Sequence, residues 1–218
     1  MMHRHSLHRR RVGMLCVGLA GLALSAVNAD EPLWEGQENK LEVTSTTFTE
    51  NGPLPDSAIY NSISQGANIC TANGAAGGDQ SPQLQWSHVP PNTRSFVVVL
   101  YDTTAAFTHW GMYNIASHVR ALPANAGAAG STYGSQVNND FGDPSYDGPC
   151  PPAGVAPDAH HYVFTVYALD TELNVSTLTN FPANPETLYH ALIGAARGGH
   201  LLASGSLGTD YSATPPAN

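Results

Sequence analysis

Basic residues are scarce in this chain. Its 218 residues include 8 lysines and arginines against 17 aspartates and glutamates. Half of the basic residues lie before residue 30, whereas every acidic residue lies from residue 30 onward. The chain from residue 30 therefore has four basic and seventeen acidic groups, a formal charge of −13 with histidine neutral. Such a surface repels nucleic acid and anionic lipid at long range, so we expect no nucleic-acid partner.

Long apolar runs are also missing, apart from one near the start. Residues 12–27 carry no charge, follow a cluster of arginines and end in Val27-Asn28-Ala29. This run is shorter than the about 20 residues of a membrane span, and small residues follow it where a signal peptidase cleaves. We therefore expect residues 1–29 to be a secretory signal peptide cleaved after Ala29, with an N-terminal anchor helix as the alternative. The mature protein would be periplasmic or secreted, without a transmembrane segment.

Cysteine is limited to three residues, and only Cys70 and Cys150 would survive cleavage. An even pair in an exported chain favours a disulfide between them. A metal site that uses both thiolates is the alternative, but the sequence has no CxxC and no histidine at ligand spacing beside either cysteine. We expect no metal and no cofactor.

The remaining pattern is mostly that of strands. SFVVVLYD at 95–102 is a continuous apolar run, too short for a helix, which predicts a strand buried on both faces. The other segments with strand character are 41–49, 81–86, 109–116, 161–170 and 200–211. The long polar segment 51–80 is expected to be a loop with one short strand near Ala58–Tyr60.

One helix is expected, near residues 185–197. Asn184 can cap it, Pro185 suits its first turn, and Gly198-Gly199 can end it. No internal repeat or linker divides the chain. The prediction is a mainly β protein with a single domain over residues 30–212 and a flexible tail at 213–218.

Four places carry side chains capable of chemistry. Asp102 and His109 flank one short loop, and alternation along the next strong strand sends His160 and Tyr162 to one face and His161 to the other. The fourth place is the loop 148–152, whose glycine and prolines restrict the backbone. Each also has a simpler explanation: a turn carboxylate, a partly buried aromatic group, a solvated histidine and a rigid turn.

Five motifs, taken in order, resemble the phosphatidylethanolamine-binding protein family and its exported bacterial Raf-kinase-inhibitor-like branch. They are DQSPQLQW (79–86), HWGMYNIA (109–116), YDGPCPP (146–152), HHYVFTVYALD (160–170) and GGHLLASGSLGTDY (198–211). The resemblance implies a β-sandwich of two antiparallel sheets with few peripheral helices. It also implies a small pocket for an anion or phosphoryl head group, lined by Asp102, His109, Tyr146, Gly148, Pro149, His160 and Tyr162.

The sequence departs from the family pattern around this pocket. Where the family has Asp-Pro-Asp-Ala-Pro, residues 102–106 read Asp-Thr-Thr-Ala-Ala, so both prolines and one carboxylate are missing. The usual His-Arg-Tyr is His160-His161-Tyr162 here. If Asp102 raises the pKa of a pocket histidine, phosphate affinity would fall as the pH rises above about 7.

Three functions follow from these features. The first is a non-catalytic protein that binds a small anion or phosphoryl head group. The second is a protease inhibitor or signalling modulator that acts on a protein partner. The third is a phosphoester hydrolase that uses Asp102, His109 and His160 as acid and base, although no motif positions a serine or cysteine nucleophile.

Overall fold

A computed structural model of the protein describes residues 40–175 and 183–215. The expected signal peptide lies outside the described residues. The larger sheet has five antiparallel strands in the order β10-β9-β5-β6-β8, and a smaller sheet has the order β1-β4-β7. The five strands are β5 (Ser95–Asp102), β6 (Phe107–Ala116), β8 (Ser135–Gln136), β9 (His160–Leu169) and β10 (Leu201–Tyr211). The smaller sheet consists of β1 (Glu42–Thr44), β4 (Leu84–Ser87) and β7 (Ala121–Leu122).

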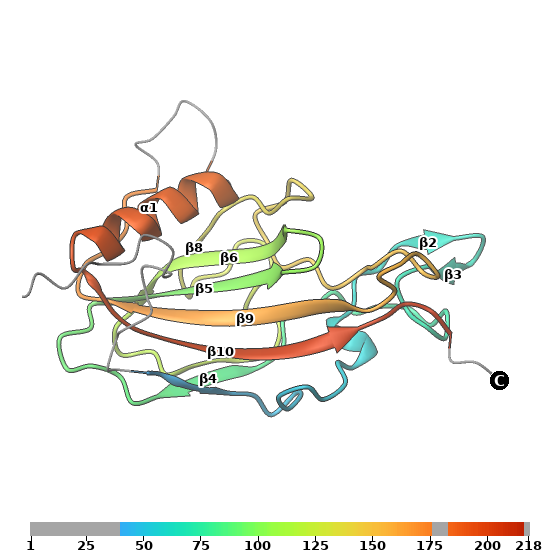
Figure 1. Ribbon diagram of the computed structural model, residues 1–218, viewed down its shortest axis with the longest axis horizontal. Coiled ribbons are helices and arrows are strands. Elements are labelled where there is room, and N and C mark those ends of the chain that lie inside the picture. The colour runs from blue at the N-terminus through green and yellow to red at the C-terminus, as the bar shows by residue number, and fades with distance from the viewer. Residues whose placement is uncertain (1–39, 176–182, 216–218) are drawn as a thin grey trace, which may run out of the picture. The chain divides into compact units, whose positions relative to one another are not determined.

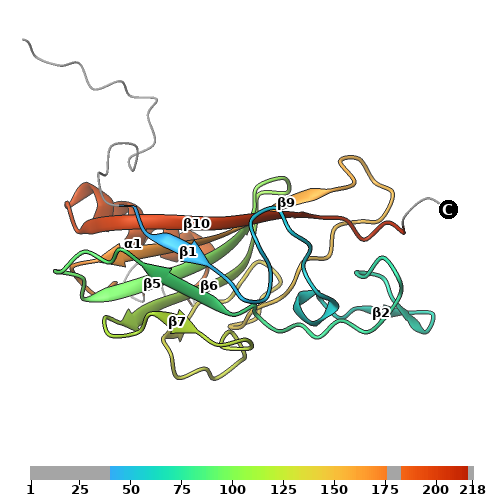
Figure 2. The same cartoon turned by 90° about the horizontal axis from the view of Figure 1, so that it is seen from below.

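The apolar run of β5 is explained by cores on both sides of the larger sheet. Phe96, Val98 and Leu100 face the smaller sheet and belong to the main core, whereas Val97 and Val99 face the other way. Figures 1 and 2 show β1 and β4 on one side of the larger sheet and the helix α1 on the other. The prediction of a β-sandwich with a central strand buried on both faces is therefore confirmed.

The predicted helix is also confirmed, as α1 (Pro185–Arg197). The Asn184 side chain accepts a hydrogen bond from the Thr187 backbone N–H, and the Thr187 hydroxyl accepts one from the Asn184 N–H. This reciprocal capping box fixes the first turn. Leu188, Leu192 and Ala195 then pack into the second core, between α1 and the larger sheet.

Two local predictions were wrong. No strand lies at Ala58–Tyr60: Ala58 ends the 3₁₀ helix η1 (Asp56–Ala58), and the strands of this region are β2 (Ile63–Ser64) and β3 (Ala67–Asn68). Gln65 and Gly66 both have positive φ, which suits the two-residue turn that joins β2 to β3. The strand expected over 41–49 is confined to β1, because the side chain of Gln83 takes over the Thr46 backbone N–H beyond it.

The last described residues pack against the fold. Tyr211 donates a hydrogen bond to the Cys70 carbonyl, Ala213 is buried, and the hydroxyls of Ser212 and Thr214 bond to Asp158. The boundary expected at residue 212 therefore falls inside a packed segment. Among the residues that the structure describes, no helix is long and apolar enough to span a bilayer.

The expected disulfide is present between Cys70 and Cys150, which lie 80 residues apart in the sequence. It joins the β2–β3 region to the loop before β9. Closing a loop of this size restricts the unfolded chain and stabilises the fold by roughly 4 kcal/mol in the chain-entropy model.

Replacing both cysteines by serine should therefore lower the free energy of unfolding by roughly 4 kcal/mol, measured by denaturant titration. A reducing agent should produce a similar loss in the natural protein and none in the double variant. Equal stability of the oxidised protein and the double variant would contradict the assignment.

Candidate functional site

Three strand ends meet at one end of the larger sheet. Asp102 closes β5, and it lies opposite Phe107 of β6 on one side and Tyr162 of β9 on the other. Because alternate residues of a strand share a face, His160 lies on the same side of β9 as Tyr162. Asp102, His160 and Tyr162, which lie in separate segments of the sequence, are thus brought together by the strand register.

A β-bulge aims His109 into this group. Leu100 pairs with Trp110 and Tyr101 with Thr108, so His109 is the extra residue of β6. The bulge lets His109 and Trp110, although consecutive, both face the main core, where the His109 ring lies edge-on to that of Tyr162 at 5.3 Å. Bulges are common beside functional sites for this reason.

The carboxylate of Asp102 organises one side of the site. Its Oδ2 accepts a hydrogen bond from Nδ1 of His160 at 2.7 Å, and its Oδ1 accepts from the backbone N–H groups of Thr104 and Ala105 at 2.8 and 3.0 Å. The side chain of Asp102 is almost fully buried. Because a carboxylate only accepts, Nδ1 of His160 carries a hydrogen, and Nε2 is the ring atom left for a ligand.

His109 is fixed differently. Its Nδ1 lies 3.0 Å from the backbone carbonyl oxygen of Asp147 and donates to it, which leaves Nε2 for the site. Burial lowers the pKa of His109 below its ordinary value of 6.5, although the Asp147 carbonyl and the charge of Asp102 act in the opposite direction. Asp102 does act to raise the pKa of His109, as expected for a pocket histidine, but burial has the larger effect. At neutral pH this ring is uncharged and its Nε2 accepts a hydrogen bond.

Tyr162 keeps its proton throughout the physiological range. Burial raises its pKa far above the ordinary 10.0, and the nearby carboxylate of Asp102 raises it further. The hydroxyl of Tyr162 therefore keeps its hydrogen beside the two histidines, and it bonds to the carboxylate of Asp102.

These side chains line one cavity of about 160 Å³. Its walls are Asp102, Ala105, Phe107, His109, Phe141, Cys150, Pro151, Pro152, His160 and Tyr162. Four predicted site residues are among them: Asp102, His109, His160 and Tyr162. The cavity is smaller than the roughly 300–1,000 Å³ of pockets that hold drug-sized ligands, so it suits a small group.

The other three predicted site residues, Tyr146, Gly148 and Pro149, are not among the residues that line the cavity. The Tyr146 hydroxyl donates to the Ala58 carbonyl at 2.7 Å, and the Pro149 carbonyl accepts from the Tyr60 N–H at 3.3 Å. At Gly148 a Cβ atom would meet the Ala58 carbonyl oxygen at 2.3 Å, so only glycine permits this close approach. These residues anchor the loop to residues 58–60, while Cys150, Pro151 and Pro152 line the cavity.

Sequence reasoning missed the aromatic rim. The ring of Phe141 stacks on Tyr60, with centroids 4.9 Å apart, and lies edge-on to Phe107 at 4.7 Å. Phe141 is 43% exposed at the cavity mouth. It comes from an irregular loop without a motif, so the sequence offers no signal for it.

The loop that lacks the family's prolines is held by hydrogen bonds instead. Thr103 donates its backbone N–H to the His161 carbonyl at 2.9 Å, and the Thr104 hydroxyl accepts from the His161 N–H at 2.9 Å. The ring of His161 faces away from the cavity and bonds to Asp210 at 2.7 Å. The loop is thus attached to β9 at the point where His160 enters the site.

A larger groove of about 560 Å³ lies on the outer face of the larger sheet, beside α1. It is lined by uncharged residues, among them Tyr101, Tyr167 and Tyr189. None of the predicted site residues reaches it, so the small cavity remains the candidate site. In the described part of the chain, no three His, Cys, Asp or Glu side chains are arranged to hold a metal ion.

Comparison with known proteins supports the fold. The family model for phosphatidylethanolamine-binding protein matches residues 44–212. The YbcL protein of Escherichia coli is 41% identical over 125 residues, which cover 51% of this chain and 67% of YbcL. YbhB of the same organism is 33% identical over 139 residues, covering 61% and 80% of the two chains.

Two solved structures share the fold. The crystal structure of E. coli YbcL, described as a new member of the mammalian PEBP family, superposes with a TM-score of 0.62 at 30% identity. It covers 79% of this chain and 98% of YbcL. A PEBP homologue from Chlamydia trachomatis superposes with a TM-score of 0.58 at 26% identity, covering 80% and 98% of the two chains.

The burial of His109 predicts its titration. In the free protein, the ring signals of His109 should titrate with a midpoint below pH 6.5, followed by NMR and assigned with a His109→Gln variant. Because the folded pKa is depressed, His109 contributes stability above pH 6.5 that is lost as the pH falls. A midpoint at or above 6.5 would contradict the burial argument.

Proposed function

The chain belongs to the phosphatidylethanolamine-binding protein family, in the branch of YbcL and YbhB, and we propose that it is an exported, non-catalytic protein that binds a small phosphoryl anion. The observation that carries the proposal is that two histidines, each held by a hydrogen bond at Nδ1, leave their Nε2 atoms for one small cavity. His109 presents an acceptor, and His160, paired with Asp102, presents a donor when its ring is protonated.

A monoprotonated phosphoryl group matches this arrangement. It has a P–OH that can donate to Nε2 of His109 and a P–O⁻ that can accept from Nε2–H of His160. Charge-assisted hydrogen bonds of this kind are shorter and roughly twice as strong as neutral ones, so no lysine or arginine is needed in the cavity.

The same geometry distinguishes a phosphomonoester from a phosphodiester. A diester has no P–OH, so its phosphoryl group leaves Nε2 of His109 without a donor. An unpaired buried acceptor costs about 1–3 kcal/mol, which corresponds to roughly 5- to 150-fold in affinity. The apolar rim of Phe107 and Phe141 would then contact the organic part of the ester.

The test is a calorimetric titration of the chain from residue 30 with phosphorylethanolamine and with glycerophosphorylethanolamine. We expect the monoester to bind more tightly, and His160→Ala to weaken its binding roughly 10- to 100-fold through loss of a hydrogen bond to a charged group.

His161→Ala is the matched control, since this neighbouring histidine lies on the opposite face of β9. It should bind like the unmodified protein. Equal affinity of His160→Ala and His161→Ala would refute the proposed site, and tighter binding of the diester would refute the role given to His109.

A further inference from the structure

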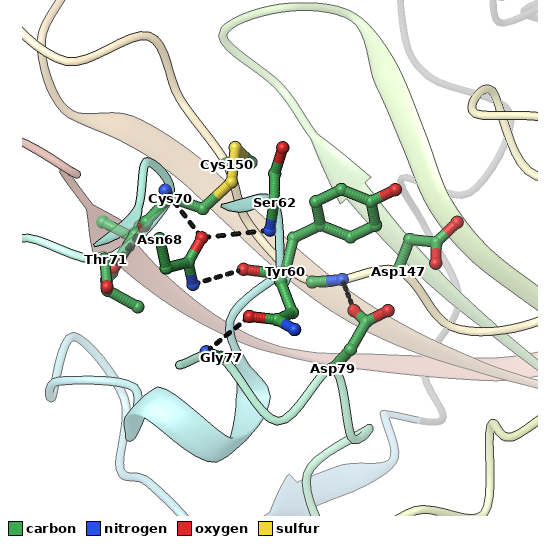
Figure 3. Close-up of a disulfide and its surroundings, with 12 residues drawn as sticks. Tyr60, Ser62, Asn68, Cys70, Thr71, Gly77, Asp79, Asp147 and Cys150 are labelled. Carbon is green, nitrogen blue, oxygen red and sulfur yellow. Dashed lines mark hydrogen bonds between the residues drawn. A yellow bond between two sulfur atoms is a disulfide. The ribbon is translucent and has the colours of Figure 1, made fainter. Parts of the chain in front are cut away.

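Two acidic side chains lie close together behind the cavity wall. Asp147 is 4% exposed and Asp79 is half-buried, and each carboxyl group lies close enough to the other to affect its pKa. Figure 3 shows both beside Tyr60, with Asp79 reaching the backbone of the neighbouring loop. There Oδ1 of Asp79 accepts a hydrogen bond from the Gly148 N–H at 2.7 Å.

Two buried carboxyl groups this close repel each other when both are ionised, and a proton shared between them removes the repulsion. Ionised carboxylates only accept hydrogen bonds, so two carboxyl groups can bond to each other only when one is protonated. Burial is the largest cause that raises the pKa of both, and it places that of Asp147 at about 6. The bond from Asn139 acts against this rise on Asp147, and the charge of Asp79 adds to it.

The pair is connected to the site through Asp147. The backbone carbonyl of Asp147 accepts from Nδ1 of His109, and its N–H donates to the His109 carbonyl at 3.1 Å. Nδ2 of the buried Asn139 donates both to Oδ2 of Asp147 at 2.6 Å and to the His109 carbonyl at 3.2 Å. Oδ1 of Asn139 accepts from the N–H of Phe141 at 2.9 Å. Through these hydrogen bonds, a movement of the Asp147 carboxyl group would also displace the ring of His109 and the backbone of Phe141.

The two acidic residues have little freedom to separate. Cys70 and Cys150 tie the two loops together by a disulfide, as Figure 3 shows. Asp79 has a positive φ of 50° and donates its N–H to the Ile59 carbonyl at 3.0 Å. Loss of the shared proton would therefore make the two carboxylates repel each other, and the backbone of Asp147 would have to move.

We propose that the Asp79–Asp147 pair is a pH-dependent switch. While the two carboxyl groups share a proton, in mildly acidic solution, the Asp147 backbone keeps His109 in its binding orientation. When the shared proton is lost, the two carboxylates repel each other and His109 is held less firmly. Only its effect on ligand affinity rests on the proposed function. The pair itself can be tested without a ligand.

The groups around the pair support this reading of its charge. Asp143, which is exposed, adds negative charge to both carboxyl groups. Tyr60 and Tyr146 face the pair and stay uncharged because burial raises their pKa, and His109 is neutral because burial lowers its pKa. Since the pKa of both acids is raised above the ordinary 3.8, their contribution to stability is complete below about pH 4 and is lost as the pH rises through about 6.

Asp79→Asn is the decisive variant. The amide oxygen can still accept from the Gly148 N–H, and the amide N–H can donate to Asp147 without a shared proton. At pH 5 the infrared C=O band of a buried protonated carboxyl group should be present in the unmodified protein and lost in the variant. As the pH rises from 5 to 8, the variant should gain stability relative to the unmodified protein.

Asp143→Asn is the control, because it removes the same charge from an exposed neighbour. It should keep the infrared band and nearly the unmodified pH profile of stability. Asp147→Asn, which retains an acceptor for Asn139, is the reciprocal variant and should lose the band as well. A band that is absent from the unmodified protein at pH 5, or that persists in both pair variants, would overturn the proposal.

The affinity measurement uses inorganic phosphate at pH 5.5 and 7.5. Protonation of the phosphate itself affects every variant alike, so the comparison isolates the protein. The unmodified protein should lose about fivefold or more affinity beyond the loss in Asp79→Asn, which is the lower range of coupling between two sites. If the unmodified protein and Asp79→Asn lose equal affinity between pH 5.5 and 7.5, the proposed coupling between the pair and His109 is wrong. If phosphate binds to neither protein, the proposed function fails, and the infrared and stability measurements still decide on the pair.

Discussion

The hydrogen bond between Asp102 and His160 is the interaction on which the site depends. It joins the last residue of β5 to the first residue of β9. The other carboxylate oxygen of Asp102 accepts hydrogen bonds from the backbone of the loop between β5 and β6. A carboxylate this deeply buried is costly unless it is paired, and removing one partner of a buried pair typically costs about 3–5 kcal/mol. The pocket is therefore organised around the buried carboxylate of Asp102 and the histidine that bonds to it.

The second histidine is held by the backbone rather than by a carboxylate, and this difference gives the site its chemistry. His109 sits at a bulge, is buried and keeps an unprotonated Nε2, whereas Nδ1 of His160 is bonded to the carboxylate of Asp102. In the proposed complex, the two histidines then act as an acceptor and a donor. The family likeness agrees with a binding role, while these contacts specify which protonation state of a phosphoryl ligand would fit.

Much of the fold follows from local sequence signals. The run at 95–102 is buried on both faces because cores lie on both sides of β5, and the helix begins at the capping residue that the sequence suggests. Alternation alone places His160 and Tyr162 on one face. The bulge at His109, the burial that lowers its pKa and the position of Phe141 depend on contacts between distant segments, so they could not be predicted. Tyr146, Gly148 and Pro149 belong to the right loop, but their contacts with residues 58–60, which lie far away in the sequence, could not be predicted.

The most direct test of the account is the protonation of the histidine ring nitrogens in the complex with phosphorylethanolamine, measured by nitrogen-15 NMR near pH 6. Nδ1 and Nε2 of each ring give separate signals whose positions report whether a hydrogen is attached. The account predicts a hydrogen on Nδ1 but not on Nε2 of His109, and hydrogens on both nitrogens of His160. Two rings in the same protonation state, or rings that do not respond to the ligand, would contradict it.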